Sequence, residues 1–144
     1  MTRRAEPAIM AWVGTSVLIA DDHEGFRSWA RVLLEQAGYT VVGEAADGAS
    51  AVSAARRLRP EVMLLDVQLP DTDGFEVARR LSEERWSPAV VLISTRDASD
   101  YAERLERSRV LGFLTKEELT PEALSRLVRA HDGRDPRNER RPGG

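Results

Sequence analysis

Polar side chains that could take part in chemistry follow directly after short apolar runs of this sequence. They are Asp21 and Asp22 after SVLIA, Asp66 after EVMLL, Ser94 and Thr95 after VVLI, and Lys116 after GFLT. Three carboxylates that meet at one place raise one another's pKa values unless a cation lies among them. Mg²⁺ suits such a place, because it accepts one or two carboxylates together with water and phosphate oxygens. A lysine would give a phosphoryl group a second positive charge, and a hydroxyl would give it a hydrogen bond.

The chain alternates short apolar runs with longer amphipathic segments. The apolar runs cover residues 16–20, 40–45, 61–65, 89–93 and 109–114, and the amphipathic segments cover residues 24–37, 49–58, 75–84, 98–107 and 121–130. In the first amphipathic segment, Phe26, Ala30, Leu33, Leu34 and Ala37 recur at the spacing of a helix face. The pattern predicts five strand-helix units.

Several residues mark the ends of the predicted helices. Asp73 with Glu76 three positions later is typical of an N-terminal capping pair. Thr120 before Pro121 places a cap ahead of a proline in the first helical position. Gly38 follows the first amphipathic segment, where a glycine commonly ends a helix.

The apolar runs also predict how the strands associate. Residues 62–65 and 89–93 are apolar at every position, as in strands that are covered on both faces. We therefore expect an α/β fold, a three-layer doubly wound (βα)5 sandwich around a central five-stranded parallel sheet. Ligands of such sheets bind beyond the carboxyl ends of the strands, near the point where the strand order reverses. The polar residues described above would meet at that edge.

Length and composition limit the class of protein. A chain of 144 residues is sufficient for one compact domain, expected over residues 16–130, after an N-terminal extension (1–15) and before a disordered tail (131–144). With 21 basic and 24 acidic side chains, the charge gives no reason to expect direct nucleic-acid binding. The chain has no cysteine and no apolar run near the roughly 18 residues of a membrane span. We expect a cytoplasmic location without a membrane contact.

The order of these motifs resembles the receiver domain of bacterial response regulators, which has a flavodoxin-like fold. The resemblance rests on DD after the first run, LLDVQLPDTDG around the third, IST after the fourth and GFLTK at the fifth, and it covers about residues 16–130. The segment GFLTKEEL is similar to receivers that usually precede a helix-turn-helix output domain. The chain is interpreted as a receiver without an attached output domain, or as part of a longer regulator.

The resemblance assigns a role to each site residue. Asp66 would accept a phosphoryl group from a histidine kinase or a phosphotransfer protein. Asp22 would bind Mg²⁺ directly and Asp21 through water, with Asp66 and the backbone carbonyl of Gln68 as further ligands. Lys116 would pair with Asp66 and then with its phosphate. In this family the domain is a phosphoacceptor with at most self-phosphorylation and autodephosphorylation activity, and not otherwise an enzyme.

The resemblance also implies how the signal leaves the site. Ser94 would bond a phosphoryl oxygen, and Phe113 would turn inward as Ser94 moves. The changed surface would then bind an output protein that the sequence does not identify, or form a phosphorylation-dependent homodimer. Taken one by one, these residues also have structural interpretations: strand-end aspartates often cap helices, and an aromatic side chain commonly lies in the core. His23 is interpreted as a solvated residue of a first helical turn.

Two positions depart from the common pattern of the family. Glu117 follows the lysine where many relatives have a proline, which predicts a looser loop. Gln68 and Arg96 each lie two residues after a key position, where the family varies and tunes the lifetime of the phosphoaspartate. Arg96 would either shield the acyl phosphate or attract an acidic group of a partner.

Two other functions were weighed. A pseudo-receiver would bind partners without phosphorylation, but it would be expected to lack Asp66, Lys116 or the acidic pair, all of which this chain has. A haloacid-dehalogenase-like phosphatase also forms an aspartyl phosphate with Mg²⁺. It would need a second acid two residues after the nucleophile, where this chain has Gln68.

Overall fold

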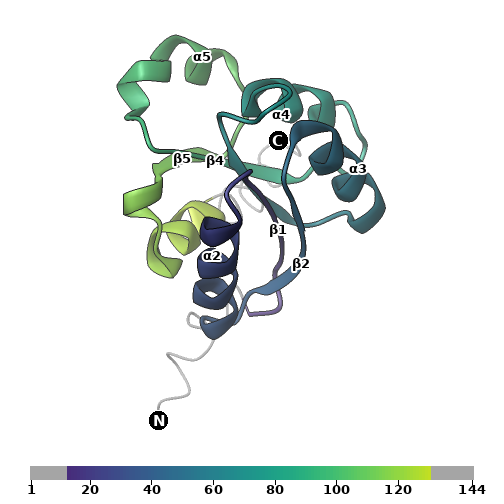
Figure 1. The fold of residues 1–144 in the computed structure, drawn as a ribbon, viewed down its shortest axis with the longest axis vertical. Helices are drawn as coiled ribbons and strands as arrows, with labels where there is room; N and C mark the ends of the chain where they lie inside the picture. The colour runs from purple at the N-terminus through teal and green to yellow at the C-terminus, as the bar shows by residue number, and fades with distance from the viewer. Residues whose placement is uncertain (1–12, 131–144) are drawn as a thin grey trace, which may run out of the picture.

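The computed structural model describes residues 13–130, which fold around one parallel sheet. Its strands are β1 (Ser16–Ala20), β2 (Thr40–Ala45), β3 (Val62–Asp66), β4 (Ala89–Ser94) and β5 (Gly112–Thr115), in the spatial order β2-β1-β3-β4-β5 (Figure 1). All four neighbouring pairs are parallel. This is the doubly wound parallel sheet that the apolar runs predict, with the strand order of the flavodoxin-like fold that the resemblance implies. The predicted extension before residue 13 and the predicted tail after residue 130 lie outside the described residues.

Helices cover both faces of the sheet. They are α2 (Glu24–Gln36), α3 (Gly48–Leu58), α4 (Gly74–Ser82), the 3₁₀ turn η3 (Ala98–Tyr101) with α5 (Ala102–Arg107), the 3₁₀ turn η4 (Lys116–Glu118), and a helical segment over residues 121–130. Buried side chains of α3 and α4 pack on one face, with α5 beside them. Those of α2 and of residues 121–130 pack on the other face.

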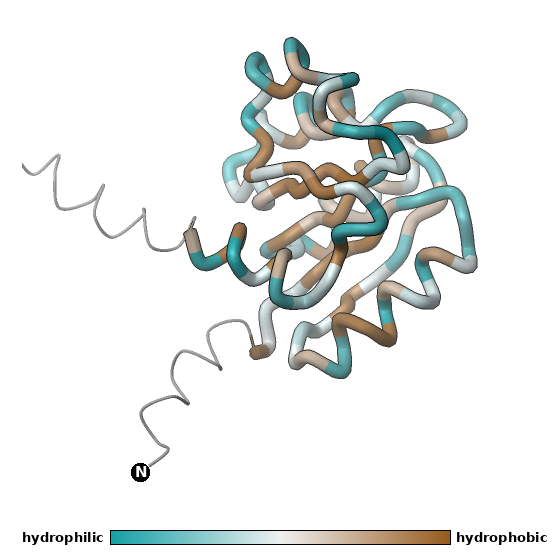
Figure 2. The backbone as a smooth tube through the Cα atoms, turned by 90° about the vertical axis from the view of Figure 1, so that its left-hand side faces the viewer, coloured by the Kyte–Doolittle hydropathy of each residue, from teal (hydrophilic) through white to brown (hydrophobic). Residues whose placement is uncertain are grey.

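The core consists of two layers separated by the sheet. In β1, Leu18 and Ala20 belong to the layer under α3 and α4, whereas Val17 and Ile19 belong to the layer under α2. All of β3 is buried, so both faces of this central strand are covered. The hydropathy-coloured trace shows the hydrophobic strands inside and hydrophilic stretches along the surrounding segments (Figure 2). Burial of both faces explains why the strands are apolar at every position.

The predicted helix ends are present in the structure. Asp73 Oδ1 accepts a hydrogen bond from Glu76 N at 2.9 Å, and Thr120 Oγ1 accepts one from Ala123 N at 3.0 Å. Gly38 follows α2 with φ of 105°, a left-handed conformation that suits glycine.

Two predicted boundaries were wrong. The segment 98–107 is a 3₁₀ turn followed by a short helix, because the backbone at Tyr101 (φ −123°, ψ 17°) is not helical. The last strand begins at Gly112 and not at residue 109. The apolar residues Val110 and Leu111 that suggested the earlier start contribute to the two core layers from outside the strand.

The loop between β3 and α4 is tied to the start of α3. Asp71 Oδ1 accepts a hydrogen bond from Gly48 N at 2.7 Å, and Asp71 Oδ2 accepts one from Ala49 N at 3.0 Å. These bonds lower the pKa of Asp71, because backbone N–H groups stabilise its charged form. Asp71 therefore ties the loop after β3 to the N-terminal end of α3. No helix in residues 13–130 has both the length and the hydropathy of a membrane span.

Gly74 allows α4 to begin directly against the end of β3. A Cβ atom at this position would lie 2.6 Å from the carbonyl oxygen of Asp66 and 3.0 Å from Leu92 Cδ2. The backbone N–H of Gly74 donates to the carbonyl oxygen of Val67 at 2.7 Å. The close packing of α4 against the end of β3 therefore requires a residue without a side chain.

We predict that Gly74→Ala lowers the free energy of unfolding by about 1 to 3 kcal/mol, because the added methyl group must displace backbone atoms. Gly25→Ala is the matched control, since a Cβ at Gly25 in α2 meets no atom within 4 Å. Urea unfolding checks both variants. Equal stability of Gly74→Ala and the parent would show that α4 can move away from β3 at little cost.

Candidate functional site

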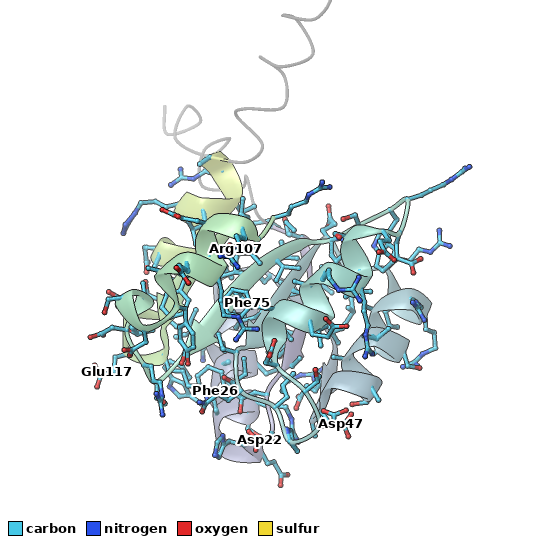
Figure 3. The ribbon with its side chains drawn as sticks, turned by 90° about the horizontal axis from the view of Figure 1, so that it is seen from above. Asp22, Phe26, Asp47, Phe75, Arg107 and Glu117 are labelled. Carbon is cyan, nitrogen blue, oxygen red and sulfur yellow. The ribbon has the colours of Figure 1, made fainter. Side chains whose placement is uncertain are left out.

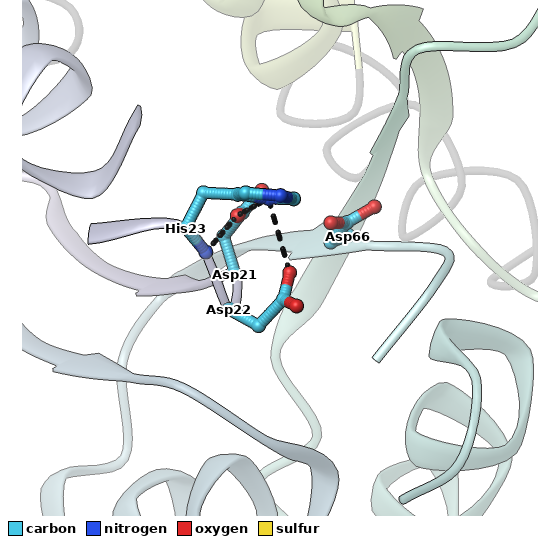
Figure 4. A group of neighbouring side chains, drawn as sticks. All are labelled: Asp21, Asp22, His23 and Asp66. Carbon is cyan, nitrogen blue, oxygen red and sulfur yellow. Dashed lines mark hydrogen bonds and ion pairs between the residues drawn. The ribbon is translucent and has the colours of Figure 1, made fainter. Parts of the chain in front are cut away.

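The candidate site lies where β1 and β3 end, in the middle of the sheet. The chain passes from β1 to β2 on one side and returns to β3 on the other, so the strand order reverses here. Asp21 directly follows β1, and Asp66 is the last residue of β3. Figure 4 shows both carboxylates together with Asp22 and His23. The topology therefore brings together side chains that are 45 residues apart in the sequence.

The four side chains form a compact group of possible metal ligands. Asp21, Asp22, His23 and Asp66 each offer one ligand atom, and these atoms lie within 4.8 Å of one another. Asp21 is completely buried and Asp66 is 4% exposed, whereas Asp22 and His23 face the solvent. The group is therefore open on one side and closed on the other.

Lys116 approaches the two buried carboxylates from the end of β5. Its Nζ lies 2.6 Å from Asp21 Oδ2 and 3.4 Å from Asp66 Oδ2. Asp21 Oδ2 is buried, and no other group within the described residues donates a hydrogen bond to it. The ion pair with Lys116 therefore compensates its negative charge. The ammonium group also lies 4.6 Å from the ring centroid of Phe26 in α2. One cation thus compensates two buried carboxylates.

The loop that carries Lys116 is well ordered by local hydrogen bonds. Thr115 Oγ1 accepts a bond from Glu118 N at 3.2 Å, and Glu118 Oε1 accepts one from Thr115 N at 3.0 Å. These two bonds form a capping box around the η4 turn. These two bonds act against the looser loop that Glu117 predicts.

Burial and repulsion together raise the pKa of Asp66 to about 6. Desolvation contributes most, the negative charge of Asp21 adds to it, and the Gln68 N–H and Lys116 oppose it. Burial acts to lower the pKa of Lys116, but contact with Asp21 and the charge of Asp66 outweigh it and raise this pKa. The site is thus short of positive charge when both carboxylates are ionised.

These residues fit a small divalent cation. The donors are mainly carboxylate oxygens, which Mg²⁺ and Ca²⁺ prefer, and Asp21 Oδ2 has a free acceptor capacity. His23 Nδ1 lies 3.2 Å from Asp21 Oδ1 and 3.1 Å from Asp22 Oδ1. His23 is exposed, as expected, but it is the residue before α2 and not part of its first turn, and its imidazole lies beside both carboxylates.

The other predicted site residues lie on the loop after β3, at the end of β4 and on β5. Gln68 donates its backbone N–H to Asp66 Oδ1 at 3.2 Å. Ser94 ends β4, is 1% exposed and accepts a hydrogen bond from Arg96 N at 3.0 Å. Its hydroxyl lies 3.2 Å from the hydroxyl of Tyr101. Phe113 is partly buried, and its ring centroid lies 5.9 Å from that of Tyr101.

Sequence reasoning missed Tyr101 and Phe26. Tyr101 lies between Ser94 and Phe113, and its ring also contacts Phe75 at a centroid distance of 5.9 Å. Its position in an irregular turn gave no periodic signal for this contact. Phe26 was assigned to the core face of its helix, and nothing in the local sequence indicates that Lys116 lies over its ring.

Several known proteins are similar to this chain. The model of the response regulator receiver domain family matches residues 17–129. The chain is similar to a transcriptional regulator of Pseudomonas aeruginosa (36% identity over 110 residues, 76% of this chain and 53% of that protein). It is similar to the transcriptional regulatory protein PdtaR of Mycobacterium tuberculosis (34% identity over 120 residues, 83% and 56%). The chain spans about half the length of these curated relatives.

A solved structure shows the same arrangement of strands and helices. The signal receiver domain of the response regulator NarL from Mycobacterium tuberculosis matches with a TM-score of 0.69 at 32% identity, covering 81% of this chain and 98% of that one. The match extends over nearly the whole of that domain.

The raised pKa of Asp66 leads to a prediction about stability. At a pH below its ordinary pKa, the Asp66 carboxyl is protonated in both the folded and the unfolded chain. As the pH rises, the unfolded chain releases this proton first and the folded chain keeps it until about pH 6, so the free energy of unfolding falls over this range. In EDTA, Asp66→Asn should therefore equal the parent near pH 4 and exceed it by about 1 to 3 kcal/mol at pH 7.

Urea unfolding at several pH values checks this difference. Asp97→Asn, which changes an exposed carboxyl in the loop after β4, serves as the control and should follow the parent at every pH. An Asp66→Asn variant that is less stable than the parent at pH 7 would show that the ionised carboxylate stabilises the fold.

Proposed function

The chain belongs to the response regulator receiver domain family, and from this membership we propose that it is a phosphorylation switch with Asp66 as its phosphoacceptor. One observation carries the proposal: Asp66 ends a completely buried strand, next to Asp21 and within 3.4 Å of Lys116 Nζ. A buried carboxylate with a raised pKa and a specific cationic partner is typical of a functional site. The proposed donor is a phosphohistidine of a kinase or of a phosphotransfer protein.

The transfer needs a nucleophile that is held in place and a positive charge beside the transferred phosphoryl group. In the proposed reaction, an Asp66 carboxylate oxygen attacks phosphorus, the phosphorus–nitrogen bond breaks, and its electron pair returns to the histidine imidazole. The Gln68 N–H holds Asp66 Oδ1, which leaves Oδ2 beside Lys116. Lys116 would then stabilise the negative charge on the phosphoryl oxygens.

The proposal includes Mg²⁺, for which the carboxylates of Asp21, Asp22 and Asp66 and the carbonyl of Gln68 would be the ligands. The ion, when bound, would screen the carboxylates from one another and bind a phosphoryl oxygen. The two buried carboxylates that share Lys116 as their cation and the shortage of positive charge support this assignment. His23 would have to turn away from Asp21 and Asp22 to leave their oxygens free.

We propose that Ser94 transmits the phosphorylated state. Its hydroxyl is shared between Arg96 N and the Tyr101 hydroxyl, so a bond to a phosphoryl oxygen would compete with these contacts. Release of Tyr101 would disturb its ring contacts with Phe75 in α4 and Phe113 in β5. In this proposal Tyr101 connects Ser94 with Phe113, whereas the family resemblance links those two residues directly.

The family and the relatives support our choice of partners. The relatives named above are transcriptional regulators about twice the length of the matching region. We propose that a histidine kinase supplies the phosphoryl group in the cytoplasm and that the output is carried by another segment or protein that senses the α5 and β5 surface. The switch itself would have no further catalytic activity.

We predict that incubation with acetyl phosphate and Mg²⁺ adds one phosphoryl group to the parent chain and none above background to Asp66→Asn. The amide replaces the nucleophilic oxygen at nearly unchanged volume. Intact-mass spectrometry measures the addition directly. Asp97→Asn should be labelled like the parent, because its carboxyl lies in an exposed loop. An unlabelled parent would favour a pseudo-receiver, and a fully labelled Asp66→Asn would place the acceptor elsewhere.

A second prediction concerns the relay. Ser94→Ala and Tyr101→Phe should both accept the phosphate mimic beryllofluoride, but the resulting amide shift changes over residues 111–116 should be smaller than in the parent. Each variant removes one of the two hydroxyls that meet at 3.2 Å and leaves Asp66 in place. Thr95→Val is the matched control, because Thr95 is the exposed neighbour of Ser94. Parent-sized changes in both hydroxyl variants would exclude this route.

A further inference from the structure

A groove lies between α4 and α5, apart from the carboxylate group. Its volume is about 460 Å³. Its apolar lining includes Phe75, Ala78 and Leu81 of α4 together with Pro88 and Val90 at the entry to β4. Clefts of about 300 to 1,000 Å³ with an apolar lining are typical of sites for small molecules. The groove is therefore large enough to hold a compact organic ligand.

The rim of the groove carries an excess of positive charge. Arg79 is paired with Glu76 at 2.9 Å, and Arg104 is paired with Asp73 at 2.9 Å. Arg107 and Arg109 also line the groove but form no ion pair within residues 13–130. The acidic residues of the lining thus already have partners, and two guanidinium groups are available to a ligand.

Side chains of α4 and α5 meet across the groove. Arg104 lies over the ring of Phe75, with its guanidinium carbon 4.3 Å from the ring centroid, and links the walls of the groove. Figure 3 labels Phe75 of α4 and Arg107 at the end of α5. A ligand whose apolar part packs against α4 would extend to the cations at the end of α5. Guanidinium groups bind carboxylates with two parallel hydrogen bonds.

We propose that this groove binds a small amphipathic carboxylate, with its alkyl or aryl part on the α4 floor and its carboxylate on Arg107 and Arg109. Most of the floor is already buried, and Ala78 is its partly exposed residue. An inorganic anion would leave this exposed part in water, and an uncharged apolar molecule would lack a partner for the guanidinium groups. A ligand with both parts contacts the floor as well as the rim. This binding does not depend on the phosphorylation proposed for Asp66.

Calorimetric titration of the full chain with 4-phenylbutyrate, octanoate and indole-3-acetate tests the proposal, each acid being compared with its own primary amide. At least one acid should bind saturably with one molecule per chain, and its amide should bind at least about tenfold more weakly, because it lacks the charge. Amide shift changes in ¹H–¹⁵N spectra should centre on residues 75–82 and 104–109. Saturable binding of none of the three acids would overturn the proposal.

Variants separate this site from general attraction to a basic surface. Arg107→Gln with Arg109→Gln should weaken the binding of the acid at least about tenfold. Arg57→Gln with Arg126→Gln removes the same charge from exposed positions on α3 and on the helical segment 121–130, and it should leave the affinity unchanged. Ala78→Phe, which fills the floor, should also abolish binding in a chain whose unfolding curve shows that it is folded. An equal loss in both double variants would overturn the assignment.

Discussion

The burial of two neighbouring carboxylates, Asp21 and Asp66, at the ends of β1 and β3 is the constraint on which the proposed function of this molecule depends. The parallel sheet brings the ends of β1 and β3 together and removes both side chains from water, which raises the pKa of Asp66 to about 6. Lys116 compensates part of this charge from the end of β5. The η4 capping box and the ring of Phe26 keep the ammonium group in its position. The fold thus maintains a place where additional positive charge is stabilised.

The same region is connected to the outer elements by few but specific contacts. Asp71 joins the loop after β3 to the start of α3, and Gly74 lets α4 begin against the carbonyl group of Asp66. On the other side, the hydroxyl of Ser94 meets that of Tyr101, whose ring contacts Phe75 and Phe113. A change in charge at Asp66 would therefore reach α4, α5 and β5 through a short chain of packed side chains, which is the physical basis of the proposed switch.

The sequence was informative where local patterns decide the structure. Strands that are apolar at every position predicted a sheet covered on both faces, and the order of strand ends predicted that Asp21, Asp66 and Lys116 would meet. The capping residues Asp73 and Thr120 predicted two helix starts. Contacts made by irregular segments could not be predicted in this way. Tyr101 lies in a 3₁₀ turn, and its partners Ser94, Phe75 and Phe113 come from three other elements. The orientation of His23 toward two carboxylates likewise depends on a turn without periodicity.

We propose that the carboxylate group is short of positive charge and is completed by Mg²⁺. Thermal unfolding over a range of Mg²⁺ concentrations at pH 7 tests this proposal, because an ion that binds only the folded chain raises its stability with concentration. We expect a rising midpoint for the parent and a much smaller rise for Asp22→Ala, whereas Asp47→Ala, a change at the cap of α3, should lower the starting midpoint and keep the Mg²⁺ dependence. An identical Mg²⁺ dependence in the parent and in Asp22→Ala would rule out the proposed ligand set, and a parent midpoint that does not change with Mg²⁺ would rule out the ion site.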